Sequence, residues 1–255
     1  MLENILNLNF DYVIMEKLVY SSIFIILAIL LSFKEKIGIE KELFSASIIS
    51  LIQLSIMGYF LITLFSLGMT VAYFLILLMI IVASNRVTNK IKEIPKKKMF
   101  LYSFNTMLAI TIISSIILTL SKTVPYEPQY IIPLIGMVVG NSLDVVTLTL
   151  DRLINNIKSN RGELWGYMAL GATDLQSIKP FINKSIKSAL IPQMNRTKTA
   201  GIVFIPGAMT GMIIGGADPL YAATIQIVIM WMILSGALMS ALIICYISYK
   251  DVIKL

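Results

Sequence analysis

The sequence predicts an all-α polytopic membrane protein with about seven transmembrane helices. Of its 255 residues, 57% are hydrophobic and only 14% are charged, which is more apolar surface than a water-soluble domain of this size can bury. Several apolar runs reach the roughly 20 residues that a helix needs to cross the hydrocarbon core of a bilayer. Backbone groups in lipid must satisfy their own hydrogen bonds, so runs of this length indicate a helical bundle.

The predicted spans follow these apolar runs in chain order, and we treat the whole chain, 1–255, as a single transmembrane permease domain. Basic residues then orient the bundle, because cytoplasmic connections are enriched in Lys and Arg. With the N-terminus outside and the C-terminus inside, only Lys17 and Lys122 of the 21 basic residues lie outside the cytoplasmic segments. The spans are expected at 12–33, 43–65, 67–84, 100–120, 129–150, 199–216 and 220–248.

The connection 151–198, between the fifth and sixth spans, is the one connection long enough to hold structure of its own. Thr173 and Gln176 are spaced as a capping box, which predicts a helix start. Apolar residues then recur at steps of three and four, which indicates an amphipathic helix, kinked or restarted at Pro180 and stopped near Pro192. This helix either lies on the membrane surface or transmits force from a soluble partner. Its apolar residues are Leu175, Ile178, Ile182, Ile186 and Ala189.

Enzyme chemistry has no support in the sequence. The chain contains no histidine and a single cysteine, Cys245, so zinc-type His/Cys sites are excluded. Neither the metalloprotease motif H-E-x-x-H nor the nucleophile motif G-x-S-x-G is present, and the phosphate-binding motif G-x-x-x-x-G-K-[ST] is also missing. We therefore expect a protein that is not an enzyme, and any ATP that it uses must be hydrolysed by another subunit.

Polar residues inside apolar spans are costly and are candidates for a transport pathway. Asp144 is the one carboxylate well inside a span, and Asn141 and Thr147 lie one turn to either side of it. A carboxylate with amide and hydroxyl oxygens suits a hard cation, so Asp144 is our candidate metal-binding residue. Alternatively, Asp144 pairs with Arg152 or with a lysine at the inner surface. The candidate pathway residues are Gln53, Asn141, Asp144, Thr147, Thr210 and Gln226.

Three glycines, Gly207, Gly211 and Gly215, repeat every fourth residue and share one face of the expected sixth helix. Without side chains they allow another helix to approach closely. The interpretations that remain open are packing within the chain, a dimer seam and a moving contact.

Two segments carry a family resemblance. MALGAT, at 168–173, followed by Ile191-Pro192, looks like the cytoplasmic loop of ABC permeases that enters the ATPase subunit. The longer stretch 168–230, with ALIP and PGAMTG, together with GNSLDVVTLTLDRL at 140–153, resembles the FetB/YbbM-type iron-export ABC permease family. The coupling residues that the resemblance implies are Ala169, Leu170, Gly171, Ala172, Thr173, Lys179, Pro180, Ile191 and Pro192.

The resemblance implies a permease subunit that exports iron or a related metal ion, and plant relatives are associated with aluminium tolerance. It implies a separately encoded ABC ATPase subunit that carries ATP and Mg, with no cofactor bound by this chain. One chain supplies one membrane half of such a transporter, so a homodimer in the bacterial cytoplasmic (inner) membrane is expected. The alternatives are an ion-coupled secondary transporter, for which one buried aspartate is thin support, and a non-transporting scaffold that recruits a cytosolic partner.

Overall fold

The computed structural model describes the backbone of residues 2–255 and the side chains of residues 16–61, 64, 65 and 67–255. Every regular element in this part of the chain is an α-helix, as the sequence predicts. The chain forms two compact units, 1–66 and 67–255, and each is described by itself. Six of the helices in the described residues have the length and apolar character needed to cross a membrane.

The first unit is a pair of long helices, α1 (Leu2–Lys34) and α2 (Glu40–Ser66). They are joined by a tight turn in which Gly38 has a positive φ of 82°. At this turn the Ser32 hydroxyl donates a hydrogen bond of 2.7 Å to the carboxylate of Glu40. A cavity of about 570 Å³ between the two helices is lined by leucine, isoleucine, phenylalanine and serine side chains.

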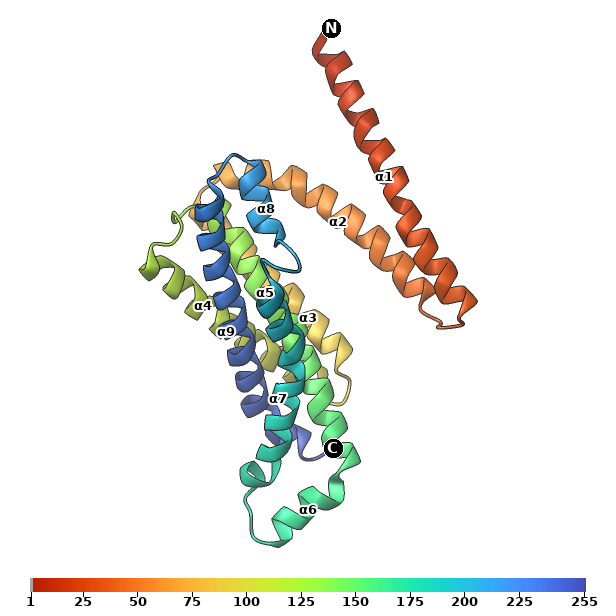
Figure 1. The fold of residues 1–255 in the computed structure, drawn as a ribbon. Helices are drawn as coiled ribbons and strands as arrows, with labels where there is room; N and C mark the ends of the chain where they lie inside the picture. Colours follow the sequence, from red (N-terminus) through yellow and green to blue (C-terminus); the bar gives the residue numbers. More distant parts are fainter. Residues whose placement is uncertain (1) are drawn as a thin grey trace. The chain divides into compact units, whose positions relative to one another are not determined.

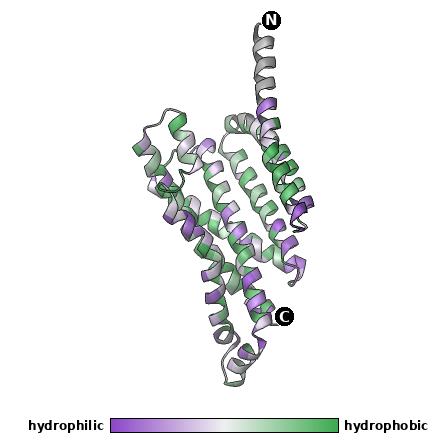
Figure 2. Ribbon diagram, turned by 45° about the vertical axis from the view of Figure 1, so that its right-hand side comes forward, coloured by the Kyte–Doolittle hydropathy of each residue, from purple (hydrophilic) through white to green (hydrophobic). Residues whose placement is uncertain are grey.

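The second unit is a bundle with α5 at its centre. Helix α5 packs against α3, α4, α7 and α9, and α9 in turn contacts α4, α7 and α8 (Figure 1). Figure 2 shows hydrophobic stretches along the helices. The helices of this unit are α3 (Met69–Lys90), α4 (Lys96–Ser121), α5 (Pro128–Ser159), α6 (Arg161–Ala169), α7 (Asp174–Thr199), α8 (Gly207–Ile214) and α9 (Pro219–Val252).

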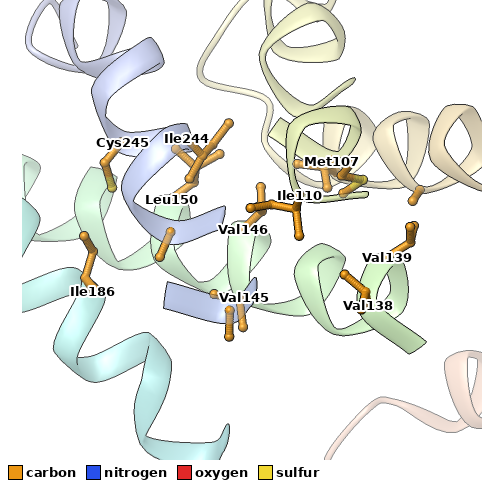
Figure 3. Close-up of a cluster of buried hydrophobic side chains, with 14 of the residues drawn as sticks. Met107, Ile110, Val138, Val139, Val145, Val146, Leu150, Ile186, Ile244 and Cys245 are labelled. Atoms are coloured by element: carbon orange, nitrogen blue, oxygen red, sulfur yellow. The ribbon is translucent and has the colours of Figure 1, made fainter. Parts of the chain in front are cut away.

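The core of the second unit lies where α4, α5, α7 and α9 meet. Figure 3 shows Ile110, Val146, Leu150, Ile186 and Cys245 among the side chains that fill this space. In lipid there is no hydrophobic driving force between helices, so the van der Waals contacts among these side chains are what hold the four helices together. The packed core holds α5 and α7 side by side, and this pairing positions the candidate site.

Helix α7 is longer than the helix that the sequence predicts. It runs unbroken through Pro180 and Pro192, so the expected restart and stop are wrong. The amphipathic pattern is confirmed for Ile178, Ile182, Ile186 and Ala189, which are buried, whereas Leu175 is 38% exposed. That face packs against α5 and α9, which compensates for the backbone hydrogen bonds that the two prolines cannot make. In this structure α7 is therefore part of the bundle, whereas the sequence left open a helix lying on the membrane surface.

The predicted span at 199–216 is also wrong as a single helix. Helix α8 has only eight residues, about 12 Å of helix, which is far too short to cross a bilayer. Between α7 and α8 the chain makes a tight loop, in which Gly201 has a φ of 86° and its amide donates to the carbonyl of Phe204 at 2.8 Å. The apolar content of residues 199–216 predicted a membrane span, but the glycines and Pro206 of this segment favour turns over helix.

Two ion pairs join helix ends of the second unit. At one end, Lys158 of α5 donates to Glu93 of the α3–α4 connection at 3.1 Å. Near the same end, Asp251 of α9 accepts hydrogen bonds from Lys98 and from Tyr102, both at 2.7 Å. The α6–α7 connection lies at this end together with the C-terminus (Figure 1).

Candidate ion pathway and coupling loop

Helix α5 has one buried face and one polar, accessible face. Asn141, Asp144, Asp151 and Asn155, here called the polar face of α5, fall within about 80° of the helix circumference. All four are exposed or half-buried, whereas the opposite side of the helix is packed into the core. Ionisable groups at membrane depth normally face a water-filled cavity or a protein partner. The polar face of α5 is therefore the best candidate pathway in the described part of the chain.

Asp144 stands where two cavities meet. One, of about 90 Å³, lies between α5 and α7. The other, of about 340 Å³, lies between α5 and the end of α3, and Asp144 shares it with Thr147, Asp151 and Lys90. A larger cavity of about 930 Å³ between α3, α4 and α5 shares Thr147 and Lys90 with the second one. Polar groups thus line a series of neighbouring spaces along α5.

The structure brings together three of the predicted pathway residues. Asn141, Asp144 and Thr147 lie on adjoining turns of α5, as predicted, and each lines at least one of these cavities. The Asn141 amide donates to the carbonyl of Met137 at 2.8 Å, which leaves its Oδ1 free to accept. The Thr147 hydroxyl donates to the carbonyl of Leu143 at 2.7 Å.

The other three predicted residues lie elsewhere. Gln53 is exposed on α2, in the first unit. Thr210 is exposed on α8, with its hydroxyl donating to Pro206 at 3.2 Å. Gln226 is buried on α9 and its Oε1 has no hydrogen-bond partner. None of them lines the cavities beside Asp144.

An ion pair does not account for Asp144. The salt bridges found among the described residues are Lys98–Asp251 and Lys158–Glu93. Asp144 therefore pairs neither with Arg152 nor with a lysine of the described chain, which was the alternative that the sequence left open. At the α3–α4 connection, by contrast, the hydrogen bond from Lys158 holds the pKa of Glu93 below its usual value.

Sequence reasoning missed the residues that face Asp144 from other helices. Gln193 and Arg196 of α7 line the 90 Å³ cavity with Asp144, and Lys90, at the end of α3, lines the 340 Å³ cavity with it. Gln193 continues the buried face of α7 in steps of three and four from Ile186 and Ala189, so the amphipathic pattern could have found it. The expected helix stop at Pro192 concealed that continuation.

The predicted coupling loop is a defined turn between α6 and α7 with a glycine at its corner. Helix α6 ends in a Schellman motif, in which the Ala172 amide donates to Tyr167 at 3.1 Å and the Gly171 amide to Met168 at 2.9 Å. This motif requires a left-handed residue, and Gly171 supplies it with a φ of 88°. Thr173 then caps α7: its hydroxyl accepts from the Gln176 amide, and the Gln176 side chain accepts from the Thr173 amide. The predicted capping box is confirmed.

The turn presents apolar side chains at one end of the unit. Leu170 is 88% exposed and Trp165, on α6, is 64% exposed. A cavity of about 400 Å³ beside them is lined by α6, by Asp174 and by the C-terminal residues 253–255. Large exposed apolar groups that are rimmed by polar residues mark protein interaction sites.

The predicted coupling residues divide between the two ends of α7. Ala169 to Thr173 form the turn, and Lys179 and Pro180 are exposed on the first turns of α7. Ile191 and Pro192 lie about 27 Å from Thr173 along the helix. Pro192 lines the Asp144 cavity, so the structure puts it with the pathway candidates.

The glycine stripe is open on its surface. No atom of the described chain lies within 4 Å of a Cβ built at Gly207 or at Gly211, and at Gly215 only carbonyl oxygens of Gly211 and Met212 do. Among the described residues of the second unit, no other helix packs closely on the stripe. The close approach in the second unit is at Gly236 of α9, where a Cβ would meet Ile110 at 3.4 Å.

Comparison with known proteins decides the family. The model of the family described as "Uncharacterised protein family (UPF0014)" matches residues 15–253. The chain belongs to the UPF0014 family. The resemblance predicted from the segments 140–153 and 168–230 is confirmed, and no solved structure gives a significant match.

Named UPF0014 relatives include bacterial and plant membrane proteins. "Probable iron export permease protein FetB" of Escherichia coli (strain K12) is 35% identical over 239 residues, 92% of this chain and 90% of the relative. "UPF0014 membrane protein STAR2" of Oryza sativa subsp. japonica is 33% identical, over 92% of this chain and 82% of the relative. "Protein ALUMINUM SENSITIVE 3" of Arabidopsis thaliana is 33% identical, over 89% and 83%. The chain is thus a membrane protein of a transporter-permease family.

Proposed function

We propose that this chain is the membrane-spanning permease subunit of an ATP-driven ABC transporter that exports iron or a related metal ion. A separate ATPase subunit binds ATP with Mg and docks at the α6–α7 turn. Two copies of the permease form the membrane part. The family membership and the name of the bacterial relative support this assignment.

Helix α7 is the observation that carries the proposal. It begins at the exposed turn, at Thr173, and reaches the Asp144 cavity through Pro192, Gln193 and Arg196. Its 26 residues correspond to a rod of about 39 Å. A partner that pushes on the turn would therefore move one wall of the cavity, because a single unbroken helix joins the turn to the cavity.

The polar face of α5 supports the homodimer. It exposes Asp144, Asp151 and Asn155 on the surface of a single chain, and a lipid-facing carboxylate is costly. A second copy that presents the same face would enclose these groups in one water-filled space. The metal ion would be the substrate of that space, held by oxygen ligands.

Reconstitution with the ATPase tests the function. The chain is co-purified with the ABC ATPase encoded beside it, and vanadate-sensitive ATP hydrolysis is measured in liposomes with and without Fe(II), Mn(II), Cu(I) and Al(III). Stable association and hydrolysis raised by one ion support the proposal. Transport that persists without ATP or partner would identify an ion-coupled carrier, and association without transport would identify a scaffold.

A further inference from the structure

The cavity of about 930 Å³ between α3, α4 and α5 has a lining that changes from apolar to basic along α3. The residues of α3 that line it are exposed and come in three pairs, and the residues between the pairs are buried. This spacing puts the pairs on one face of the helix, over about 14 Å of its length. In chain order the pairs are Ile81-Val82, Asn85-Arg86 and Asn89-Lys90.

The basic end of this cavity carries positive charge that no acidic group of the cavity balances. Two cations and two amides line it, and no carboxylate of the described chain does. Arg86 is exposed and forms no salt bridge with a described residue. Lys90 also borders the 340 Å³ cavity that contains Asp144 and Asp151, so its charge is partly offset. Arg86 is therefore the main unbalanced cation of the cavity.

The start of α4 adds to this excess of positive charge. Its first turn contains three lysines and no acidic residue, although the amide end of a helix is itself positive and favours anions. Lys98 pairs with Asp251, whereas Lys96 and Lys97 are exposed and form no salt bridge with a described residue. Both lie one turn before Phe100, which lines the cavity, and so they share its side of the helix. An anion in the cavity would offset their mutual repulsion.

We propose that this cavity binds the headgroup of an anionic phospholipid of the cytoplasmic leaflet. Arg86 and Lys90 bind the phosphate, since a guanidinium matches phosphate oxygens in pairs, and the acyl chains lie along Ile81, Val82 and Leu143. The apolar end favours a lipid over a free phosphate, which would leave it unused. A volume of about 930 Å³ equals that of about thirty waters, enough for a headgroup and the first carbons of its chains. Basic cavities between membrane helices at the cytoplasmic surface suit such headgroups, and the distribution of basic residues predicts that surface at this end.

Lipid binding by the purified full-length chain tests the site. Phosphatidylglycerol, or phosphatidylcholine with the same acyl chains, is added to the protein in detergent micelles, and bound lipid is measured by native mass spectrometry. The natural chain should bind phosphatidylglycerol more tightly. Arg86→Gln should weaken phosphatidylglycerol binding about fivefold, the effect of one cation near a membrane surface, and should leave phosphatidylcholine binding unchanged. Because Arg86 is exposed, the variant should unfold at the same temperature as the natural chain in phosphatidylcholine alone.

Arg152→Gln is the matched control, because Arg152 is an exposed arginine of α5 that lines none of the cavities described above. It should bind phosphatidylglycerol as the natural chain does. Equal weakening in Arg86→Gln and Arg152→Gln, or equal affinity of the natural chain for the two lipids, would overturn the inference.

Two other occupants of the cavity are distinguished by the same measurement. Glycerol 3-phosphate, which lacks acyl chains, should not displace the lipid even in excess, and displacement would identify a soluble phosphate compound as the ligand instead. Native mass spectrometry also reports the number of chains in the complex. An Arg86→Gln chain that keeps its lipid but loses a second copy would show that the second copy covers the cavity, which would equally overturn the inference.

Discussion

Replacement of Gly171 by tryptophan should uncouple the transporter while leaving the permease folded. Gly171 has a φ of 88°, and no atom lies within 4 Å of a Cβ built on it. A side chain there carries a backbone cost of about 1–2 kcal/mol, whatever its size. No clash within the chain is added to this cost, because the space is open.

Comparison of Gly171→Ala with Gly171→Trp separates the effect of backbone strain on stability from the effect of a large side chain on ATPase docking. Gly171→Ala and Gly171→Trp share the backbone cost, so both should unfold at similar temperatures. A tryptophan forced into a packed interface costs a further 1–3 kcal/mol, roughly, which corresponds to about a 5- to 150-fold loss of affinity. ATPase association and stimulation should therefore survive in Gly171→Ala and fall in Gly171→Trp.

Gly38→Trp is the control for an exposed turn elsewhere. Gly38 has a φ of 82° and open space around it, and it lies in the α1–α2 connection. This variant should carry the same strain and retain coupling. If Gly171→Trp keeps ATPase stimulation and transport, the α6–α7 turn is not the coupling element.

Three further perturbations test the packing that holds the site. Thr173→Ala removes the side-chain half of the capping box and should destabilise the start of α7 by about 1 kcal/mol, seen as faster amide exchange in its first turn. Gly236→Leu drives a side chain toward Ile110, which a Cβ already meets at 3.4 Å, and should cost about 1–3 kcal/mol in thermal unfolding. The hydrogen bond from Lys158 lowers the pKa of Glu93. The pair therefore stabilises the fold fully when the pH is above the ordinary pKa of glutamate, and this contribution is lost as the pH falls through the lowered pKa. Glu93→Gln should flatten that part of the pH dependence of the free energy of unfolding. The effect should stay below about 1 kcal/mol because the pair is partly exposed. An acid unfolding profile that is unchanged in Glu93→Gln would contradict the role of the pair.

The fold class and the capped start of α7 at the α6–α7 turn could be predicted because both depend on local sequence. Apolar length predicts membrane helices, and Thr173 and Gln176 form their capping box within four residues. The triad of Asn141, Asp144 and Thr147 was also predictable, since residues three apart on one helix are neighbours by geometry.

Features that depend on tertiary packing could not be predicted in the same way. Pro180 and Pro192 would break an isolated helix, but α7 continues because α5 and α9 pack against its apolar face. The residues that line cavities together with Asp144 come partly from α3 and α7, and hydropathy does not indicate which helices become neighbours. The segment at 199–216 has the apolar content of a span, but glycines divide it into a loop and a short helix.

The burial of Cys245 has a practical consequence for watching this protein at work. It is the one cysteine of the chain, and it lies fully enclosed in the core. A thiol with no access to reagent gives almost no background in labelling experiments. Cysteines introduced at Leu170 and at Asn155 could therefore be labelled selectively without removing Cys245. A fluorophore at each position would report whether movement of the α6–α7 turn is followed by movement at the polar face of α5, and with what delay.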